Sequence, residues 1–317
     1  MRLVCKICDN AEANRMHTAR EMGFGLREPF PYLECGRCGC VQLLEIPRDM
    51  AKYYPPGYYS LQPHGTVKTF LRRRWSAHAY GQSNLLGRLM TEAFFTHRPM
   101  LAFRRVNPPK FSRILDVGCG RGYLLQDLAD FGFTNLTGAD PFIERDLAYP
   151  SGVKVFKKSL AGLTGEFDLI MLHHSFEHMD EPAAVMGQIA SRLAPTGKVI
   201  LGIPVASSFA WRNYGVNWVN LDTPRHFYLH TFKSIELLTK RAGLEISEVI
   251  HEGNDEQFWA SEQFARDIPS NDPRSIGSTA LRRFSNWTTI RECRAKAAEL
   301  NRKGEADLVC FHLRKNA

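Results

Sequence analysis

A glycine-rich segment at residues 114–122, Ile-Leu-Asp-Val-Gly-Cys-Gly-Arg-Gly, constrains the fold more than any other stretch of this chain. It continues a short apolar, β-prone run, and an apolar helical pattern follows from Tyr123. Glycine has no Cβ and tolerates positive φ, so the backbone can turn tightly and a ligand can approach it closely. The following helix adds N–H groups that lack intrahelical partners. The segment therefore predicts a strand, a ligand-binding turn and a helix.

The spacing of the glycines distinguishes this turn from two known kinds of phosphate-binding loop. The dinucleotide fingerprint is Gly-x-Gly-x-x-Gly, whereas this chain has Asp-x-Gly-x-Gly-x-Gly, beginning at Asp116. No Lys-Ser/Thr pair follows, so we expect no triphosphate cradle. Asp116 would repel a pyrophosphate but could hold a cationic or hydroxylated ligand.

The motif resembles the first motif of the class I S-adenosylmethionine (SAM) methyltransferases. In that family the glycine loop passes under the methionine part of SAM, and the acid lies near its amino group. Asp140 follows the second predicted strand, where the family binds the ribose hydroxyls, and Pro141-Phe142 would contact the adenine. After the third strand the family often carries an acid for adenine. This chain has Lys157-Lys158 there, which leaves Ser159 or backbone groups for that role. The SAM-binding residues implied are Asp116, Gly118, Cys119, Gly120, Tyr123, Asp140, Pro141, Phe142, Ser159 and His173.

The same resemblance implies a Rossmann-like α/β sheet of seven strands, the last of them antiparallel and placed between the fifth and sixth. The sequence places strands at 113–117, 135–139, 153–156, 167–172, 198–203, 245–251 and 306–314. We expect three regions. A small zinc-binding module occupies 1–50, a tyrosine-rich linker with a pair of entry helices over the cofactor occupies 51–110, and the methyltransferase domain occupies 111–317 with a helical insertion at 254–304.

Two Cys-x-x-Cys pairs, Cys5–Cys8 and Cys35–Cys38, mark the amino-terminal module. Two residues between ligands let both thiolates point at one ion, and two such pairs match a tetrahedral zinc site. Four thiolates leave no open position, so the zinc would be structural. Disulfides are the competing interpretation, which a cytosolic context disfavours.

Composition limits the class of protein. The chain has 317 residues, of which 44% are hydrophobic, enough for one large core and an appendage. No run of 18 apolar residues exists, so we expect no membrane partner. The amino terminus lacks the apolar region of a signal peptide, and we expect a cytoplasmic protein. The net charge of +8 is compatible with nucleic acid and equally with an anionic small substrate.

A polar cluster, His173-His174-Ser-Phe-Glu177-His178, follows the fourth strand at the edge where α/β sheets bind ligands. It resembles the segment after strand four in SAM methyltransferases, where Glu-His is common. The ubiquinone-pathway O-methyltransferases carry acids there that bind a divalent ion, and here His174 replaces the first of them. Two interpretations stay open. Either His174, Glu177 and His178 form a metal set, or Glu177 and His178 hold the loop by hydrogen bonds.

Two aromatic segments could either pack or line the active site. The first contains Tyr53, Tyr54, Tyr58 and Tyr59. The second follows strand five and contains Phe209, Trp211, Tyr214 and Trp218. Such residues form either a substrate platform or ordinary packing.

The cysteine module, the tyrosine segment and the core together resemble the deoxysugar C-methyltransferases. Those enzymes carry Tyr-x-Glu-His after strand five, and the histidine serves as base. His226 matches that histidine, whereas Arg225 stands where Glu would be and Thr223 where Tyr would be. Deprotonating a sugar carbon needs a strong base, whereas a positioned histidine suffices for a hydroxyl. We therefore expect O-methylation of a sugar, nucleotide-sugar or polysaccharide precursor, with C-methylation as the alternative.

The expected catalytic residues are His226, or else His174, as proton acceptor, and Arg225 as the contact for an anionic acceptor group. The expected cofactors are SAM and a structural zinc ion, in a monomer or homodimer. A rival is an RNA methyltransferase with a zinc knuckle, which makes nucleic acid a less favoured partner. It lacks the Asn/Asp-Pro-Pro-Tyr/Phe motif after strand four. A catalytically silent SAM-binding or zinc interaction protein is a further alternative.

Overall fold

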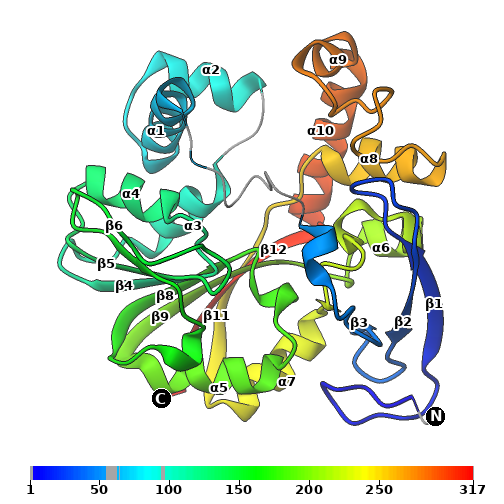
Figure 1. Cartoon of the computed structure of the whole chain (residues 1–317), viewed down its shortest axis with the longest axis horizontal. Helices are drawn as coiled ribbons and strands as arrows, with labels where there is room; N and C mark the ends of the chain where they lie inside the picture. Colours follow the sequence, from blue (N-terminus) through cyan, green and yellow to red (C-terminus); the bar gives the residue numbers. More distant parts are fainter. Residues whose placement is uncertain (1–2, 55–62, 64, 94–96, 317) are drawn as a thin grey trace.

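A central sheet of eight strands organises the computed structural model, which describes residues 3–54, 63, 65–93 and 97–316 (Figure 1). The strands lie side by side in the order β11-β12-β9-β8-β4-β5-β7-β6. Their bounds are β4 Arg113–Val117, β5 Asn135–Ala139, β6 Leu147–Ala148, β7 Lys154–Phe156, β8 Phe167–His173, β9 Leu193–Pro204, β11 Leu244–His251 and β12 Leu308–Lys315.

The sheet has the predicted topology. Strands β7, β5, β4, β8 and β9 run parallel, and β12 lies antiparallel between β9 and β11. The predicted Rossmann-like methyltransferase fold is thus confirmed. The two-residue β6 adds an eighth strand at one edge. The strand predicted at 198–203 begins earlier, because β9 also contains residues 193–197, where the pairing with β8 jumps from Leu193 to Lys198.

Helices cover both faces of the sheet, which explains why its central strands are apolar throughout. Along β4, Ile114 and Leu115 point to opposite faces and join different core clusters. One face packs against α5 (Pro182–Arg192) and α7 (Phe232–Arg241), and the other against α3 (Arg98–Val106) and α4 (Tyr123–Asp130). The carboxyl edge of the parallel strands is left for ligands.

Three helices, rather than the expected pair, precede the sheet: α1 (Thr66–Tyr80), α2 (Leu85–Ala93) and α3. A buried ion pair fixes α1 to α4, because Arg72 contacts Asp127, which is 1% exposed. Ser76 also donates to Asp127 at 2.5 Å, and Arg72 donates to the Tyr123 carbonyl at 2.6 Å. The basic run at residues 72–74 therefore contributes a clamp next to the glycine loop.

The amino-terminal module forms a second, four-stranded sheet in the order β1-β2-β3-β10. Strands β1 (Arg15–Arg20), β2 (Pro29–Glu34) and β3 (Val41–Leu43) come from the module, whereas β10 (Tyr228–Leu229) comes from the segment that follows His226. Figure 1 shows this sheet at the right of the central one. The module and the methyltransferase core thus share one sheet.

The predicted insertion at 254–304 contains α8 (Glu256–Ala265), α9 (Ala280–Ser285) and α10 (Trp287–Lys303). The aromatic segment before it forms α6 (Phe209–Tyr214) and packs in the interior. Trp218 is fully buried and donates to Asp307 Oδ2 at 2.9 Å. The indoles of Trp211 and Trp218 are core residues, which favours the packing interpretation for these two rings. None of the described helices is long and apolar enough to cross a membrane.

Candidate active site

The glycine loop connects β4 to α4 in a conformation that requires glycine. Gly118, Gly120 and Gly122 have φ values of +72°, +53° and +70°. A Cβ on Gly118 would also overlap the Ser175 side chain, which itself donates to the Val117 carbonyl at 2.8 Å. The loop is therefore pressed against the start of the polar cluster that follows β8.

Asp140 ties this loop to the tip of β5. Its Oδ2 accepts a hydrogen bond from the Gly120 N–H at 2.8 Å, and its Oδ1 accepts from the Phe142 N–H at 2.9 Å. Asp116 lies close by at 5% exposure. Burial and then the charge of Asp140 raise the pKa of Asp116 to about 8. A cationic ligand group would favour the ionised form of this carboxyl.

The other residues expected to bind SAM follow neighbouring strands at the same edge. Phe142 is 77% exposed, as suits a contact with a ligand, and Ser159 is exposed after β7. Tyr123 begins α4 and lies 5.0 Å beneath the Arg72 guanidinium. Burial lowers the pKa of His173, at the end of β8, to about 3. Cys119 faces Gly138, where a Cβ would lie only 2.5 Å from its Sγ.

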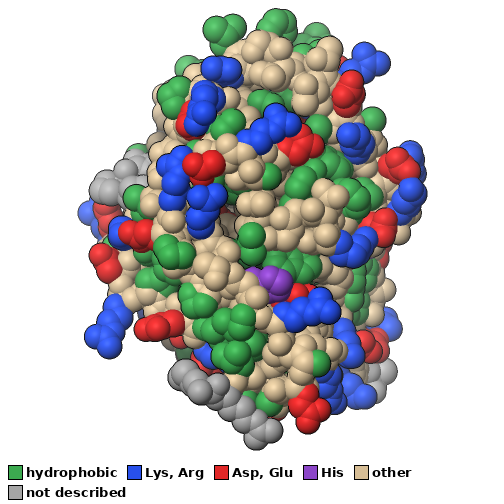
Figure 2. Space-filling model, turned by 90° about the vertical axis from the view of Figure 1, so that its right-hand side faces the viewer, with side chains coloured by type: hydrophobic (Ala, Val, Ile, Leu, Met, Phe, Trp, Pro, Cys, Tyr) green, Lys and Arg blue, Asp and Glu red, His purple; other side chains and the backbone are tan. Residues whose placement is uncertain are grey.

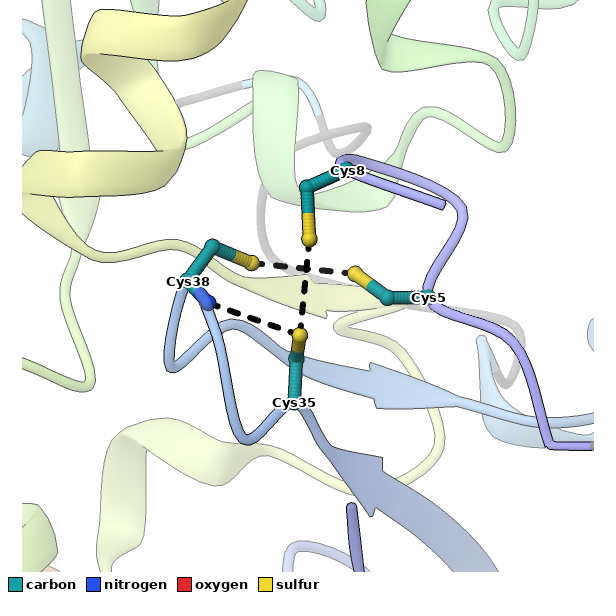
Figure 3. Close-up of side chains that lie close together, drawn as sticks. All are labelled: Cys5, Cys8, Cys35 and Cys38. Atoms are coloured by element: carbon teal, nitrogen blue, oxygen red, sulfur yellow. Dashed lines mark hydrogen bonds between the residues drawn. The ribbon is translucent and has the colours of Figure 1, made fainter. Parts of the chain in front are cut away.

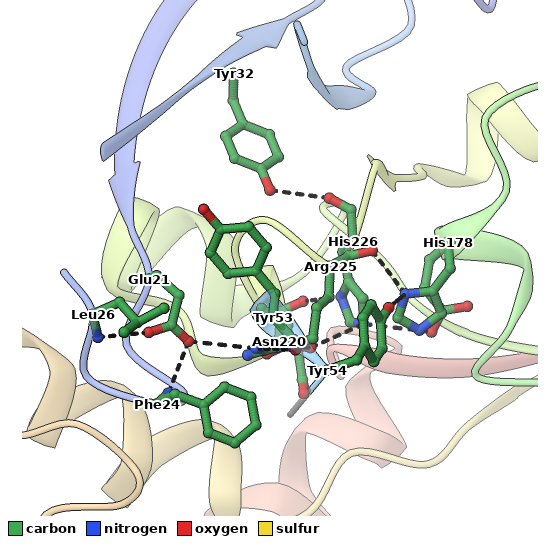
Figure 4. Close-up of polar contacts among 12 residues, drawn as sticks. Glu21, Phe24, Leu26, Tyr32, Tyr53, Tyr54, His178, Asn220, Arg225 and His226 are labelled. Atoms are coloured by element: carbon green, nitrogen blue, oxygen red, sulfur yellow. Dashed lines mark hydrogen bonds and ion pairs between the residues drawn. The ribbon is translucent and has the colours of Figure 1, made fainter. Parts of the chain in front are cut away.

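His226 lies in a polar cluster whose residues, among them Tyr54, His178 and Asn220, come from segments far apart in the sequence (Figure 4). Its Nδ1 is 2.8 Å from the Asn220 carbonyl, which can only accept, so Nδ1 carries the proton and Nε2 has a free lone pair. Nε2 lies 3.9 Å from Glu177 Oε1 and 3.8 Å from Asp222 Oδ2. Burial, and then His178, lower the pKa of His226 to about 4. The ring is thus neutral at pH 7 and able to accept a proton.

Glu177 is fully buried, and neither carboxylate oxygen has a hydrogen-bond partner among the described residues. Burial alone would raise its pKa, but nearby His174, His178 and His226 lower it to about 2. His174, the alternative base, is half exposed with a φ of +51°, and its Nδ1 lies 3.5 Å from Glu177 Oε1. An unpartnered buried carboxylate is ready to stabilise a positive charge.

The possible metal ligands differ from the predicted set. Among the described residues, one ligand atom each from Glu177, His178 and His226 lies within 4.8 Å of the others, so His226 takes the place expected for His174. Sequence reasoning missed this combination, because His226 is 48 residues away from His178 along the chain.

The surroundings of Arg225, which was predicted to contact an anionic acceptor group, do not favour that role. It is 3% exposed and already pairs with two carboxylates, those of Asp222 and Glu21. Two neutralising partners leave little attraction for a further anion. Glu21 was missed, since it lies 204 residues before Arg225 and no local pattern marks it.

The four module cysteines point at a common centre (Figure 3). The Cys5 and Cys38 sulfurs lie 3.7 Å apart, and those of Cys8 and Cys35 lie 3.5 Å apart. Tetrahedral zinc would place its sulfurs about 3.8 Å apart, given Zn–S bonds of about 2.3 Å. The hydrogen bond from Cys38 lowers the pKa of Cys5 to about 5, which favours the thiolate. The residues fit the predicted zinc ion.

A cavity of about 360 Å³ lies between α3, the end of β11 and α10. Its wall contains Gly253, where a Cβ would lie 3.2 Å from Asp307 Oδ1. The other oxygen of Asp307 accepts from Asn220 Nδ2 at 2.8 Å, and the Asn220 carbonyl holds His226. Asp307 and Asn220 therefore lie between this cavity wall and His226.

A family model described as a methyltransferase domain matches residues 89–249, just over half of the 317 residues. The chain belongs to this methyltransferase family. That membership confirms the assignment to the SAM-dependent methyltransferases.

Curated relatives and a solved structure resemble this methyltransferase. One relative is the ubiquinone biosynthesis O-methyltransferase of Xanthomonas axonopodis pv. citri (strain 306), 30% identical over 44% of this chain and 66% of its own. Another is that of Bordetella avium (strain 197N), 31% identical over 43% of this chain and 63% of its own. The match thus spans just under two thirds of these relatives. A cyclopropane synthase from Mycobacterium tuberculosis is 15% identical, with a TM-score of 0.47 over 82% of this chain and 99% of its own.

Proposed function

We propose that this methyltransferase moves the methyl group of SAM to a hydroxyl of a small, hydroxyl-rich acceptor, such as a sugar, nucleotide-sugar or polysaccharide precursor. One observation carries the proposal: neutral His226 lies beside the buried carboxylate of Glu177, whose oxygens accept no hydrogen bond from the described residues, next to the glycine loop. Ser175 links the two sites, because it touches Gly118 and precedes Glu177 by two residues.

The donor would be held at the carboxyl edge of β4 and β5. The Gly118–Gly122 turn offers backbone without side-chain obstruction, Asp116 would face the SAM amino group, and Asp140 the ribose hydroxyls. Phe142 would contact the adenine from its exposed position, with Ser159 nearby in the sheet order. When bound, SAM supplies an electrophilic methyl group attached to a sulfonium.

The acceptor proton would pass to His226 Nε2 as the acceptor oxygen bonds to the methyl carbon and the carbon–sulfur bond breaks. Glu177 would stabilise the resulting imidazolium, since its Oε1 lies 3.9 Å away. The Asn220 carbonyl fixes the tautomer. C-methylation is the alternative outcome, for which the same base would have to remove a proton from carbon.

The chemistry of the cavity between α3, β11 and α10 supports a hydroxyl-rich acceptor. Its wall contains the charged side chains of Arg98 and Glu252, together with Asp255, which is already paired with Arg294. Among the described residues, Asn301 Oδ1 is a buried wall atom that has no hydrogen-bond partner. Sites built from interleaved donors and acceptors suit ligands whose hydroxyls act as both.

Two other roles have weaker support. A divalent ion held by Glu177, His178 and His226 would replace the base by lowering the pKa of the acceptor hydroxyl. An RNA acceptor would need a basic surface. On the face drawn in Figure 2, however, the Lys and Arg side chains of the described residues are interspersed with Asp and Glu.

We also propose a structural zinc at the four cysteines, which implies a reducing compartment such as the cytoplasm.

The deciding experiment incubates the protein with methyl-labelled SAM and three acceptor pools: nucleotide-sugars, polysaccharide precursors and RNA. We expect label in a sugar pool. His226→Asn should lower the rate roughly 100- to 10,000-fold while SAM binding is unchanged. His17→Asn, a histidine paired with Glu34 at 2.7 Å, serves as control. Label in RNA alone would contradict the acceptor class. Full loss of activity after treatment with EDTA, restored by Mg²⁺, would favour the divalent ion.

A further inference from the structure

The loop between β1 and β2, residues 21–28, lies against one side of the Arg225 side chain (Figure 4). Glu21 from this loop is fully buried, and Arg225 is 3% exposed. The two charged groups lie 3.4 Å apart. Glu21 and Arg225 lie far apart in the sequence, and the proposed chemistry does not use Glu21. We therefore ask what this buried ion pair does.

Backbone hydrogen bonds within the loop fix the Glu21 carboxylate independently of its contact with Arg225. Its Oε1 accepts a hydrogen bond from the Phe24 N–H at 2.8 Å, and its Oε2 accepts from the Leu26 N–H at 2.9 Å. These backbone donors fix the carboxylate plane. Oε1 then faces Arg225 Nη1 with its direction set by the loop. The loop therefore presents a preorganised anion.

The shape of the loop matches the guanidinium closely. A Cβ on Gly23 would lie 2.3 Å from Arg225 Nη2, so a side chain at this position would displace the guanidinium. The ring of Phe24 lies 5.0 Å from Arg225 Cζ, within the range of a cation–π contact. The Tyr53 carbonyl accepts from Nη1 at 3.3 Å. Arg225 is thus enclosed by charge, ring and backbone.

On the side away from Glu21, Arg225 contacts Asp222, which in turn lies near His226. Arg225 Nε donates to Asp222 Oδ2 at 2.9 Å, and Nη2 donates to Asp222 Oδ1 at 2.5 Å. The same Asp222 Oδ2 lies 3.8 Å from His226 Nε2. From the module, Tyr32 also donates to the His226 carbonyl at 3.0 Å. The backbone and the ring environment of His226 therefore both depend on the amino-terminal module.

We propose that the β1–β2 loop of the cysteine module is a socket that fixes Arg225 and, through Asp222, the position of His226, with Glu21 as a positioning residue. The module is then part of the catalytic apparatus rather than a separate binding unit. This inference rests on the proposed function, in which His226 accepts the acceptor proton.

The test compares Glu21→Gln and Gly23→Ala with a matched control, Glu34→Gln, which removes a charge from the same sheet but only from the contact with His17. We expect both socket variants to lower kcat roughly 10- to 100-fold, since small displacements of a catalytic group cost about that much. The KM and Kd for SAM should stay unchanged, because the donor residues lie elsewhere. Glu21→Asp, which keeps the charge, should retain more of kcat than Glu21→Gln.

A second readout does not depend on activity. The ring signals of His226 in the NMR spectrum, assigned by their loss in His226→Asn, should shift in Glu21→Gln and Gly23→Ala but not in Glu34→Gln. Unshifted signals, or an unchanged kcat in the folded variants, would overturn the socket. So would a fall in kcat accompanied by an equal loss of SAM affinity, which indicates general destabilisation. A wild-type protein that methylates no pool would refute the proposed function alone, because the NMR comparison still decides the socket.

Discussion

Asp116 shows at the scale of one residue how burial prepares a ligand site. Its raised pKa of about 8 means that the carboxyl is mostly protonated at pH 7 without ligand. Against the amino group of SAM, the ionised form would be favoured, and the pKa would fall. The protonation state of Asp116 should therefore change when a cationic group binds beside it.

We predict that SAM binding at pH 7 releases close to one proton from Asp116. Because the unbound carboxyl holds its proton below about pH 8, SAM affinity should rise as the pH increases from 6 to 8. Calorimetry in buffers of different ionisation enthalpy measures the release. Asp116→Asn should abolish the buffer dependence. A wild-type enthalpy that is the same in all buffers would place the amino group elsewhere.

The turn between β4 and α4 makes the next prediction, at the scale of the element. Gly118→Ala should bind SAM at least tenfold more weakly. The alanine would have to adopt the left-handed φ of Gly118, and its Cβ would overlap the Ser175 side chain. Gly132→Ala is the matched control, since its φ of +86° is equally unfavourable but its surroundings are open. Both should lose about 1 kcal/mol of stability from backbone strain. Equal SAM affinity in the two variants would contradict the argument.

The docking of α1 on α4 depends on the Arg72–Asp127 pair. Arg72→Met should destabilise the protein by about 3 kcal/mol, because it leaves the buried Asp127 carboxylate without its cation. It should also weaken SAM binding, since Arg72 holds the first residue of α4 through the Tyr123 carbonyl. Urea unfolding and calorimetry measure both effects. Arg73→Met, whose pair with Asp130 is largely exposed, should cost less than about 1 kcal/mol.

The whole molecule is held together by the sheet that the module shares with the core. Strand β3 pairs with β10 directly after His226, and Thr231 donates to the Cys38 carbonyl at 2.5 Å. The Arg241 guanidinium also donates to the Ile7 carbonyl at 2.7 Å. Unfolding of the cysteine module would therefore disturb the segment around His226 and both ends of α7.

We predict that metal analysis finds about one zinc per chain, and that Cys35→Ser lowers both zinc content and melting temperature. Cys40→Ser is the control, because Cys40 is equally buried but lies outside the four-cysteine set. Zinc removal by a chelator should reduce methyl transfer more than SAM binding, since the donor residues belong to the other sheet. Full zinc content in Cys35→Ser would refute the ligand assignment.

The sequence by itself determined the parts of this protein that local spacing encodes. Local spacing encodes the glycine loop, the acids Asp116 and Asp140 at its two strands, and the two Cys-x-x-Cys pairs. Each of these patterns spans only a turn or a strand, so the sequence predicts both the secondary structure and the kind of ligand. The strand order, with β12 between β9 and β11, was implied by the resemblance to the SAM methyltransferases and is the order observed.

Only the tertiary structure decided which distant groups meet. Glu21 and Arg225 are 204 residues apart, and their contact depends on the pairing of β3 with β10, which no local pattern specifies. The same folding brought His226 to Glu177 and turned the Trp218 segment inward. Contacts of this kind reflect how buried charges and rings are paired once the two sheets pack, and that packing is a property of the whole chain.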